Sequence, residues 1–182
     1  MKTIIAILTF LTVTVSASSQ TVEDLVVKKT NALRAQIGGT TKGLAPFVRN
    51  SSLDSAAMYH ARWVVASGIG SHTETKPVKG IVPLATCADR AAKYGVTAFA
   101  ENLIAWSAYS VNDDGKVLNS VTAEKLMTLW KNSPGHLANL LSEYSSKLEP
   151  RIGIAICQYD QNYFCIVMII GSNVDANGQL IK

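Results

Sequence analysis

Several stretches of the chain repeat hydrophobic residues every three or four positions, which is the period of a helix with one buried face. The first is residues 22–37, for which Thr21 is a candidate cap. The second is residues 53–67, which we expect Ser52 to cap and Gly68 to end. The expected buried positions of these two helices are Val22, Leu25, Val26, Leu33, Ile37, Leu53, Ala56, Ala57, Ala61 and Val64.

Three shorter helices are predicted further along the chain. Residues 87–94 form a short helix that ends at Gly95. Residues 121–132 follow a candidate cap, Ser120. Residues 133–142 begin another helix at once, because Ser133 suits the cap position and Pro134 the first helical position. The expected buried positions are Ala123, Leu126, Met127, Trp130, Leu137, Leu140 and Leu141.

Two other regions have the composition of β-strands. Residues 96–106, VTAFAENLIAW, are rich in apolar and aromatic residues. Residues 151–171, RIGIAICQYDQNYFCIVMIIG, form two β-type runs around a polar turn, which predicts a hairpin. The Gly- and Pro-containing residues 41–50 are predicted to be a loop. Helices, a strand, further helices and a closing hairpin indicate an α+β domain in which helices pack on a sheet.

The N-terminus has the pattern of a secretory signal peptide. Lys2 precedes an apolar run from Ile4 to Val15, and small residues follow, so we expect cleavage after Ala17 or Ser19. The apolar run is shorter than the roughly 20 residues that cross a bilayer. Residues 20–182 have the length of one domain, and we expect a secreted, extracellular monomer without a membrane span.

Charge and cysteine content narrow the class of protein. The 17 Lys and Arg residues and 13 Asp and Glu residues are scattered, which argues against a nucleic-acid partner. Secretion would bring Cys87, Cys157 and Cys165 into an oxidising compartment. A hairpin centred near Gln161 places Cys157 opposite Cys165, so we expect a disulfide between them and a free Cys87. Asn50 heads the sequon NSS and would carry a glycan in a eukaryotic host.

Glu101 is the most unusual polar residue, because it lies inside an apolar strand. On a regular strand it shares one face with Phe99, Leu103 and Ala105, where a carboxylate must be paired or protonated. Asn102 then points to the opposite face, where its amide is expected to satisfy backbone groups.

Two histidines are candidate partners of Glu101. His72 follows two glycines in a loop, and His136 lies in the first turn of a helix, where the helix dipole favours a neutral ring. Two imidazoles and a carboxylate are a ligand set for catalytic zinc, although the chain has no HExxH motif. The remaining histidine, His60, is interpreted as a packing residue of its helix.

Nucleophilic catalysis is not expected. Cys87, Ser71 and Ser133 are the candidate nucleophiles, but none lies in a GxSxG elbow or a cysteine-protease signature.

Taken in order, these segments resemble the CAP superfamily of cysteine-rich secretory, antigen 5 and pathogenesis-related proteins, whose domain is also called SCP. The resemblance runs from about Val22 to Gly171. It rests on the segment that ends in GSH at His72, on DRAAKYGVTAFAENL, on LWKNSPGHLANLL and on the hairpin. These motifs are most similar to those of the disulfide-poor branch of the family that is common in bacteria.

This resemblance implies a three-layer α-β-α sandwich whose cleft collects His72, Glu101 and His136. Several positions depart from the family pattern, among them Leu137 in HLAN and additional residues within SEYSSKLEP before the hairpin. Ala100 replaces the usual glycine before the glutamate, and Ser133 stands where many eukaryotic members carry a second acidic residue of the cleft. These departures bear on metal affinity and catalysis more than on the fold.

Three functions are compatible with the resemblance. The first is a non-enzymatic extracellular module that binds a lipid, a sterol or a protein in host interaction or defence. It requires no cofactor, although His72 and His136 are candidate ligands for Zn²⁺ or another divalent cation. The alternative is a metal-dependent hydrolase or protease with Glu101 as ligand or general base. The third is a wall-associated structural or adhesive protein.

Overall fold

The computed structural model describes residues 20–37, 44–108, 121–143, 148–159, 163–175, 177, 179 and 180. The helices are α1 (Val22–Ile37), α2 (Ser51–Ser67), α3 (Cys87–Lys93), α4 (Ala123–Lys131) and α5 (Pro134–Leu140). The strands are β1 (Val48–Arg49), β2 (Thr97–Ala108), β3 (Pro150–Gln158) and β4 (Tyr163–Ser172). The helices and strands predicted from the sequence are all present, with small shifts at their ends.

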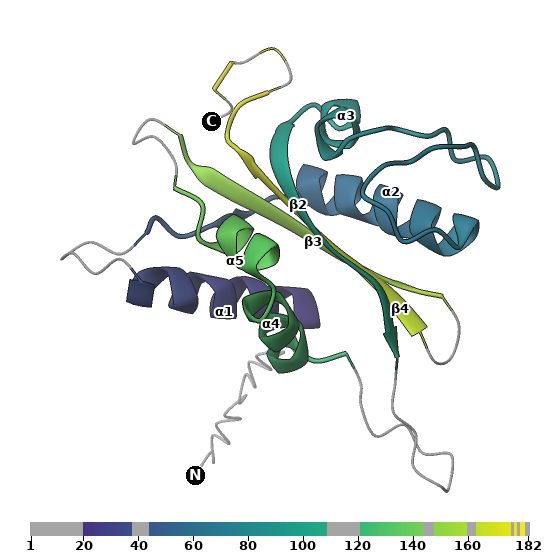
Figure 1. The fold of residues 1–182 in the computed structure, drawn as a ribbon. Coiled ribbons are helices and arrows are strands. Elements are labelled where there is room, and N and C mark those ends of the chain that lie inside the picture. The colour runs from purple at the N-terminus through teal and green to yellow at the C-terminus, as the bar shows by residue number, and fades with distance from the viewer. Residues whose placement is uncertain are drawn as a thin grey trace, which may run out of the picture.

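A single sheet separates two layers of helices (Figure 1). Its strand order is β1-β3-β4-β2, with β1 parallel to β3 and the other neighbours antiparallel. Helices α2 and α3 cover one face, and α1, α4 and α5 cover the other. The predicted α+β sandwich and the C-terminal hairpin are therefore confirmed. In the part of the chain that the structure describes, every helix is too short or too polar to cross a membrane.

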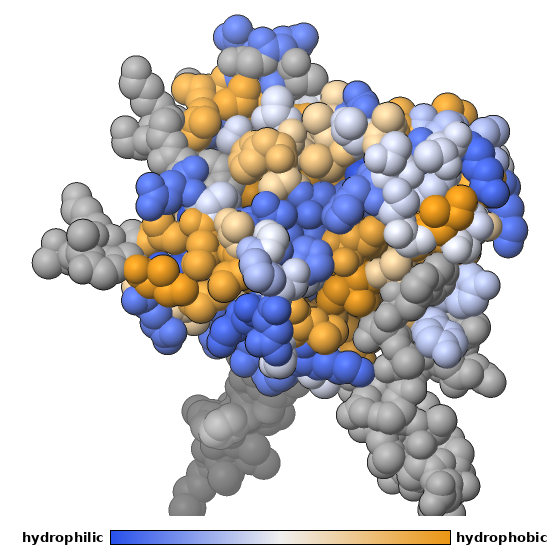
Figure 2. All heavy atoms as spheres, viewed as in Figure 1, coloured by the Kyte–Doolittle hydropathy of each residue, from blue (hydrophilic) through white to orange (hydrophobic). Residues whose placement is uncertain are grey.

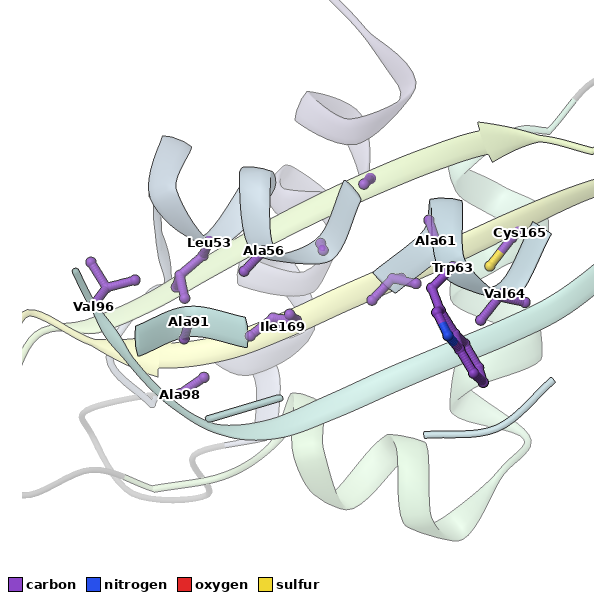
Figure 3. Packing of buried hydrophobic residues seen from close by; sticks show 13 residues of the cluster. Leu53, Ala56, Ala61, Trp63, Val64, Ala91, Val96, Ala98, Cys165 and Ile169 are labelled. Atoms are coloured by element: carbon purple, nitrogen blue, oxygen red, sulfur yellow. The ribbon is translucent and has the colours of Figure 1, made fainter. Parts of the chain in front are cut away.

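Helix α2 is the centre of the first core. Its buried positions include all five predicted from the helical period, and Figure 3 shows Leu53, Ala56, Ala61 and Val64 on the side of α2 that faces the strands. The small alanines allow α2 to lie close to the sheet. Contact is tightest at Gly153 of β3, where a Cβ atom would lie 2.1 Å from the backbone carbon of Leu53.

Two helix caps differ from the predicted ones. Asn50, rather than Ser52, caps α2, since its side-chain oxygen accepts the N–H of Leu53 at 3.0 Å. Thr122 caps α4, and the predicted cap Ser120 lies outside the described residues. Asn and Thr satisfy the same unpaired N–H groups as Ser, so composition alone does not choose between adjacent candidates.

The buried face of α1 also differs from the prediction. Ile37 is 47% exposed, whereas Thr30 and Arg34 are buried. The Arg34 guanidinium donates to the carbonyls of Ala45 and Leu140 and lies 4.1 Å from the centre of the Phe47 ring. These partners compensate for the loss of water around a buried charge, which a helical period does not reveal.

The three cysteines are free thiols. Cys157 and Cys165 lie directly opposite each other on β3 and β4, as predicted, but no disulfide joins them. The expected centre of the hairpin, Gln161, lies outside the described residues. Burial raises the pKa of the Cys165 thiol, and the negative charges of Cys157 and Glu101 raise it further.

The strand β1 was missed, because residues 41–50 were predicted to be a loop. It is only two residues long and pairs with Arg151 and Ile152 of β3. A two-residue strand has no hydrophobic period, so its existence depends on the neighbouring strand.

Candidate functional site

Glu101 lies on β2, the strand at one edge of the sheet. The pairing of β2 with β4 shifts between Ala98 and Ala100, which leaves Phe99 as the extra residue of a β-bulge. The bulge interrupts the alternation of faces. Ala98 and Glu101 therefore both point towards α2 and α3, whereas Phe99 is 52% exposed. The prediction placed Phe99 beside Glu101 on a regular strand, whereas Phe99 is the exposed residue of the bulge.

Both oxygens of the Glu101 carboxylate are held by cationic or hydrogen-bonding partners. Oε1 lies 2.8 Å from Nδ1 of His72, and Oε2 accepts a hydrogen bond of 2.6 Å from Arg90. Burial acts to raise the pKa of Glu101. The hydrogen bond from His72 and the charges of His60 and Arg90 outweigh it and hold the pKa below its usual value. Glu101 is therefore an ionised, fully paired carboxylate.

Three buried residues of this cluster were missed in the sequence. His60, Glu74 and Arg90 have fully buried side chains. Nδ1 of His60 lies 2.9 Å from Oε1 of Glu74, and its Nε2 faces Oε1 of Glu101 at 3.6 Å. His60 also stacks on Trp63, with ring centres 6.0 Å apart. The interpretation of His60 as a packing residue was incomplete, because it lies between two carboxylates.

A signal for His60 was present in the sequence. It falls within the apolar stripe of α2, between Ala57 and Ala61, so its ring had to be buried. A buried imidazole needs polar partners, and the chain supplies them from elsewhere. The sequence around Glu74 and Arg90 does not predict their burial, because neither residue lies within a stripe of apolar residues.

The cluster fastens the long segment between α2 and α3, residues 68–86, to the rest of the domain. Oε2 of Glu74 accepts the N–H of Leu84 at 2.7 Å. Arg90 donates to the carbonyls of Leu84 and His72 at 2.9 and 3.2 Å. Trp63 donates from its indole to the carbonyl of Lys76 at 2.8 Å. A segment without helix or strand is thereby held in place at several points.

His136 approaches the same strand from the other layer of the sandwich. Its helix, α5, lies on the face to which Asn102 points, and Asn102 donates its amide N–H to the carbonyl of His136 at 3.2 Å. The prediction that Asn102 satisfies a backbone group on the far face is confirmed. Burial and the charge of nearby His72 lower the pKa of His136, which favours a neutral ring. Ser133 occupies the cap position of α5 without a side-chain capping bond.

A cavity of about 320 Å³ opens beside His72 at this edge. His72, Cys87, Arg90, Phe99 and Glu101 contribute to its wall, whereas His136 and Ser133 do not. Burial and the negative charge of Glu101 raise the pKa of the Cys87 thiol. A protonated thiol is a poor nucleophile, so the cavity does not support cysteine catalysis.

The donor atoms do not fit a three-ligand catalytic zinc site. Glu101 is bound to Arg90, whose positive charge would oppose a divalent cation. Nδ1 of His72 is engaged by Glu101, which leaves only its Nε2. Within the described ranges, no group of three His, Cys, Asp or Glu side chains is arranged to hold a metal ion. The imidazoles of His72 and His136 remain as two candidate ligands.

Comparisons with known proteins agree on the fold. The model of the CAP family, described as the cysteine-rich secretory protein family, matches residues 27–170. The structure of an outer surface protein from Borrelia burgdorferi superposes with a TM-score of 0.56 at 17% identity, over 82% of this chain and 91% of that one. An extracellular protein containing an SCP domain from Bacillus anthracis str. Ames gives a TM-score of 0.51 at 17% identity, over 81% of this chain and 40% of that one. A sequence search of curated proteins found no match.

Proposed function

The chain belongs to the CAP family of cysteine-rich secretory proteins, and on this premise we propose that it is an extracellular binding protein that acts without catalysis. The proposed ligands are lipids, and among them molecules with a single acyl chain and an acidic head group. The observation that carries the proposal is a groove between α1 and α4. The full pairing of Glu101 supports the absence of catalysis.

Glu101 is poorly suited to act as a general base. A base must be within reach of substrate and must have a pKa near the working pH. Both of its carboxylate oxygens are occupied, and its pKa is lowered rather than raised. The other buried carboxylate, Glu74, is likewise bound, by His60 and by the N–H of Leu84. The cluster is better explained as an anchor for residues 68–86.

The groove between α1 and α4 combines apolar and charged surface, which an amphipathic ligand such as a fatty acid would match. Its volume is about 300 Å³, at the lower end of the roughly 300–1,000 Å³ of ligand pockets. Ala32, Leu33 and Met127 supply apolar surface, and Lys29 and Lys131 supply positive charge. Figure 2 shows hydrophobic and strongly hydrophilic residues interleaved over the layer of α1, α4 and α5.

The two lysines of the groove differ in their partners. Lys29 forms an ion pair of 2.8 Å with Glu124 across the groove. Lys131, exposed at the end of α4, has no ionic partner among the described residues. A ligand carboxylate would find its counter-charge at Lys131 while its chain covers Met127 and Leu33.

Fluorescent fatty-acid titration of the mature chain tests this proposal. Ala32→Trp fills the groove and is expected to weaken binding at least tenfold. Ala35→Trp is the matched control, because Ala35 is an exposed alanine of the same helix that does not line the groove. Equal affinities for the two variants, or no binding by wild type, would contradict the proposal.

The alternative function is a metal-dependent hydrolase or protease. It is favoured by one observation, the lowered pKa of His136 close to His72, because neutral imidazoles are metal ligands. Calorimetric titration with Zn²⁺ separates the two functions. The alternative requires binding that is lost in both His72→Ala and His136→Ala, and absence of binding by wild type removes it.

Secretion, the Cys157–Cys165 disulfide and a glycan on Asn50 belong to the same extracellular proposal. The two cysteines are register partners on neighbouring strands, so oxidation would not require a change of pairing. Asn50 uses its side-chain oxygen for the α2 cap, which leaves the nitrogen that a glycan would modify.

A further inference from the structure

The outer edge of β3 is paired over only part of its length. The strand β1 pairs with Arg151 and Ile152 alone, and the N–H of Asn50 donates to the carbonyl of Ile152 at 2.9 Å. Beyond Ile152 no strand of the described chain lies along this edge, because the sheet order places β1 last. An edge with unpaired N–H and C=O groups is a template for another strand.

The next two positions on this edge differ in how their backbone groups are satisfied. The N–H of Ile154 is covered, since it donates to the Asp54 carboxylate at 2.8 Å. Backbone direction alternates along a strand, so Ile156 directs its groups to the same edge as Ile152 and Ile154. Outside the pairing of β3 with β4, neither the N–H nor the C=O of the half-buried Ile156 has a hydrogen-bond partner among the described residues.

Helix α2 runs beside this edge in the same direction as β3 (Figure 3). Asp54 lies at Ile154, and Arg62 is close enough to Cys157 for its charge to act on that thiol. The eight residues from Asp54 to Arg62 advance about 12 Å along a helix. The three residues from Ile154 to Cys157 advance about 10 Å along a strand. The two elements therefore advance by similar distances.

The surface formed by α2 and the outer edge of β3 can therefore match a second copy of itself that is turned by 180°. Met58 is the midpoint between Asp54 and Arg62, and Ile156 lies between their partners Ile154 and Cys157. A hollow of about 440 Å³ follows this surface, with Met58, Arg62 and Ile154 in its wall. We propose that a second copy of the chain docks here, by antiparallel pairing of the two β3 edges about a two-fold axis through Ile156 and Met58.

Charge complementarity supports a second copy as the occupant. Glu23, Asp24 and Asp54 surround Arg49 at the Ile154 end, where the negative charges outnumber the positive one. Arg62 is exposed at the other end and has no ionic partner in the described part of the chain. The two-fold axis brings Arg62 of each copy against the acidic end of its partner. The result is one continuous sheet shared by two copies, in place of the monomer expected from the sequence.

Sedimentation velocity of the mature chain tests the proposal, at concentrations from about 10 μM to about 1 mM, the range in which small interfaces dissociate. Wild type is expected to dimerise within this range. Met58→Glu and Met58→Lys are each expected to be monomeric, because a residue on a two-fold axis meets itself. An equimolar mixture of the two variants is expected to recover the dimer through opposite charges.

The mixture also distinguishes a lost interface from a lost fold, since unfolded variants would not recover the dimer. Ile156→Pro removes the edge N–H and is expected to weaken dimerisation at least tenfold, because proline is tolerated on edge strands. A monomeric wild type at about 1 mM, or dimers that persist in both Met58 variants, would overturn the proposal. So would a mixture that remains monomeric while circular dichroism shows both variants folded.

Discussion

At the scale of single residues, the sequence located Glu101 and one of its partners, His72, but not the buried charges around them. Glu101 could be singled out because a carboxylate inside an apolar strand must be paired. The position of Glu101 in the strand does not reveal which residue pairs with its carboxylate. His72 was identified, and it does contact Glu101. Arg90 and Glu74 were not, because a charged residue becomes unusual only when the fold buries it.

Arg90 holds the cluster together, so its loss is expected to be costly. Arg90→Met leaves the buried carboxylates of Glu74 and Glu101 without their arginine partner. Breaking a buried ion pair on one side costs about 3–5 kcal/mol. We expect the free energy of unfolding at neutral pH, measured with urea, to fall by about this amount. Lys28→Met, which replaces an exposed cation of α1, is the control and is expected to change the free energy of unfolding little.

The same variant is expected to change the pH dependence of stability. In wild type the pKa of Glu101 is lowered, so its contribution is present above the unfolded pKa, about 4.3, and is lost as the pH falls through the lower folded value. Without Arg90, its charge and its hydrogen bond no longer lower the pKa of Glu101, so that pKa rises. The variant should then lose less stability than wild type when acidified from neutral pH to about pH 5. Parallel pH profiles would contradict this account of Glu101.

At the scale of helices and strands, the hydrophobic period predicted which helices and strands form. It did not predict the irregularities within them. The helices of the described chain follow the 3.6-residue period. The bulge at Phe99 has no such signal, because one extra residue in a strand appears only against the partner strand. The bulge nevertheless matters for the site, because it lies two residues from the buried Glu101 and leaves Phe99 exposed in the wall of the same cavity.

The approach of α2 to β3 makes Gly153 a sensitive position. In Gly153→Ala the new Cβ would lie 2.1 Å from a backbone atom of Leu53, which no side-chain rotation can relieve. We expect a loss of about 3 kcal/mol or more in the free energy of unfolding. Gly135→Ala is the matched control, because nothing lies within 4 Å of its Cβ. It is expected to be neutral or to stabilise α5 by up to about 1 kcal/mol. Similar effects of the two substitutions would refute the close approach.

At the scale of the whole molecule, the α+β class followed from the order of elements, whereas the strand order did not. Hydrophobic patterns do not say that β2 pairs with β4 and forms the edge beside His72. The resemblance to the CAP family supplied the three layers, and the family match and the structure confirm them. It also suggested one cleft for His72, Glu101 and His136, but His136 belongs to the opposite helical layer and does not line the cavity of the other two.

We propose that this domain binds its ligand between α1 and α4, and that the polar cluster around Glu101 is an anchor. The most direct measurement is the fatty-acid affinity of the double variant His72→Ala/His136→Ala beside that of Ala32→Trp. We predict that the double histidine variant binds within about twofold of wild type and that Ala32→Trp loses at least tenfold. The reverse, loss in the histidine variant and wild-type affinity in Ala32→Trp, would contradict the account.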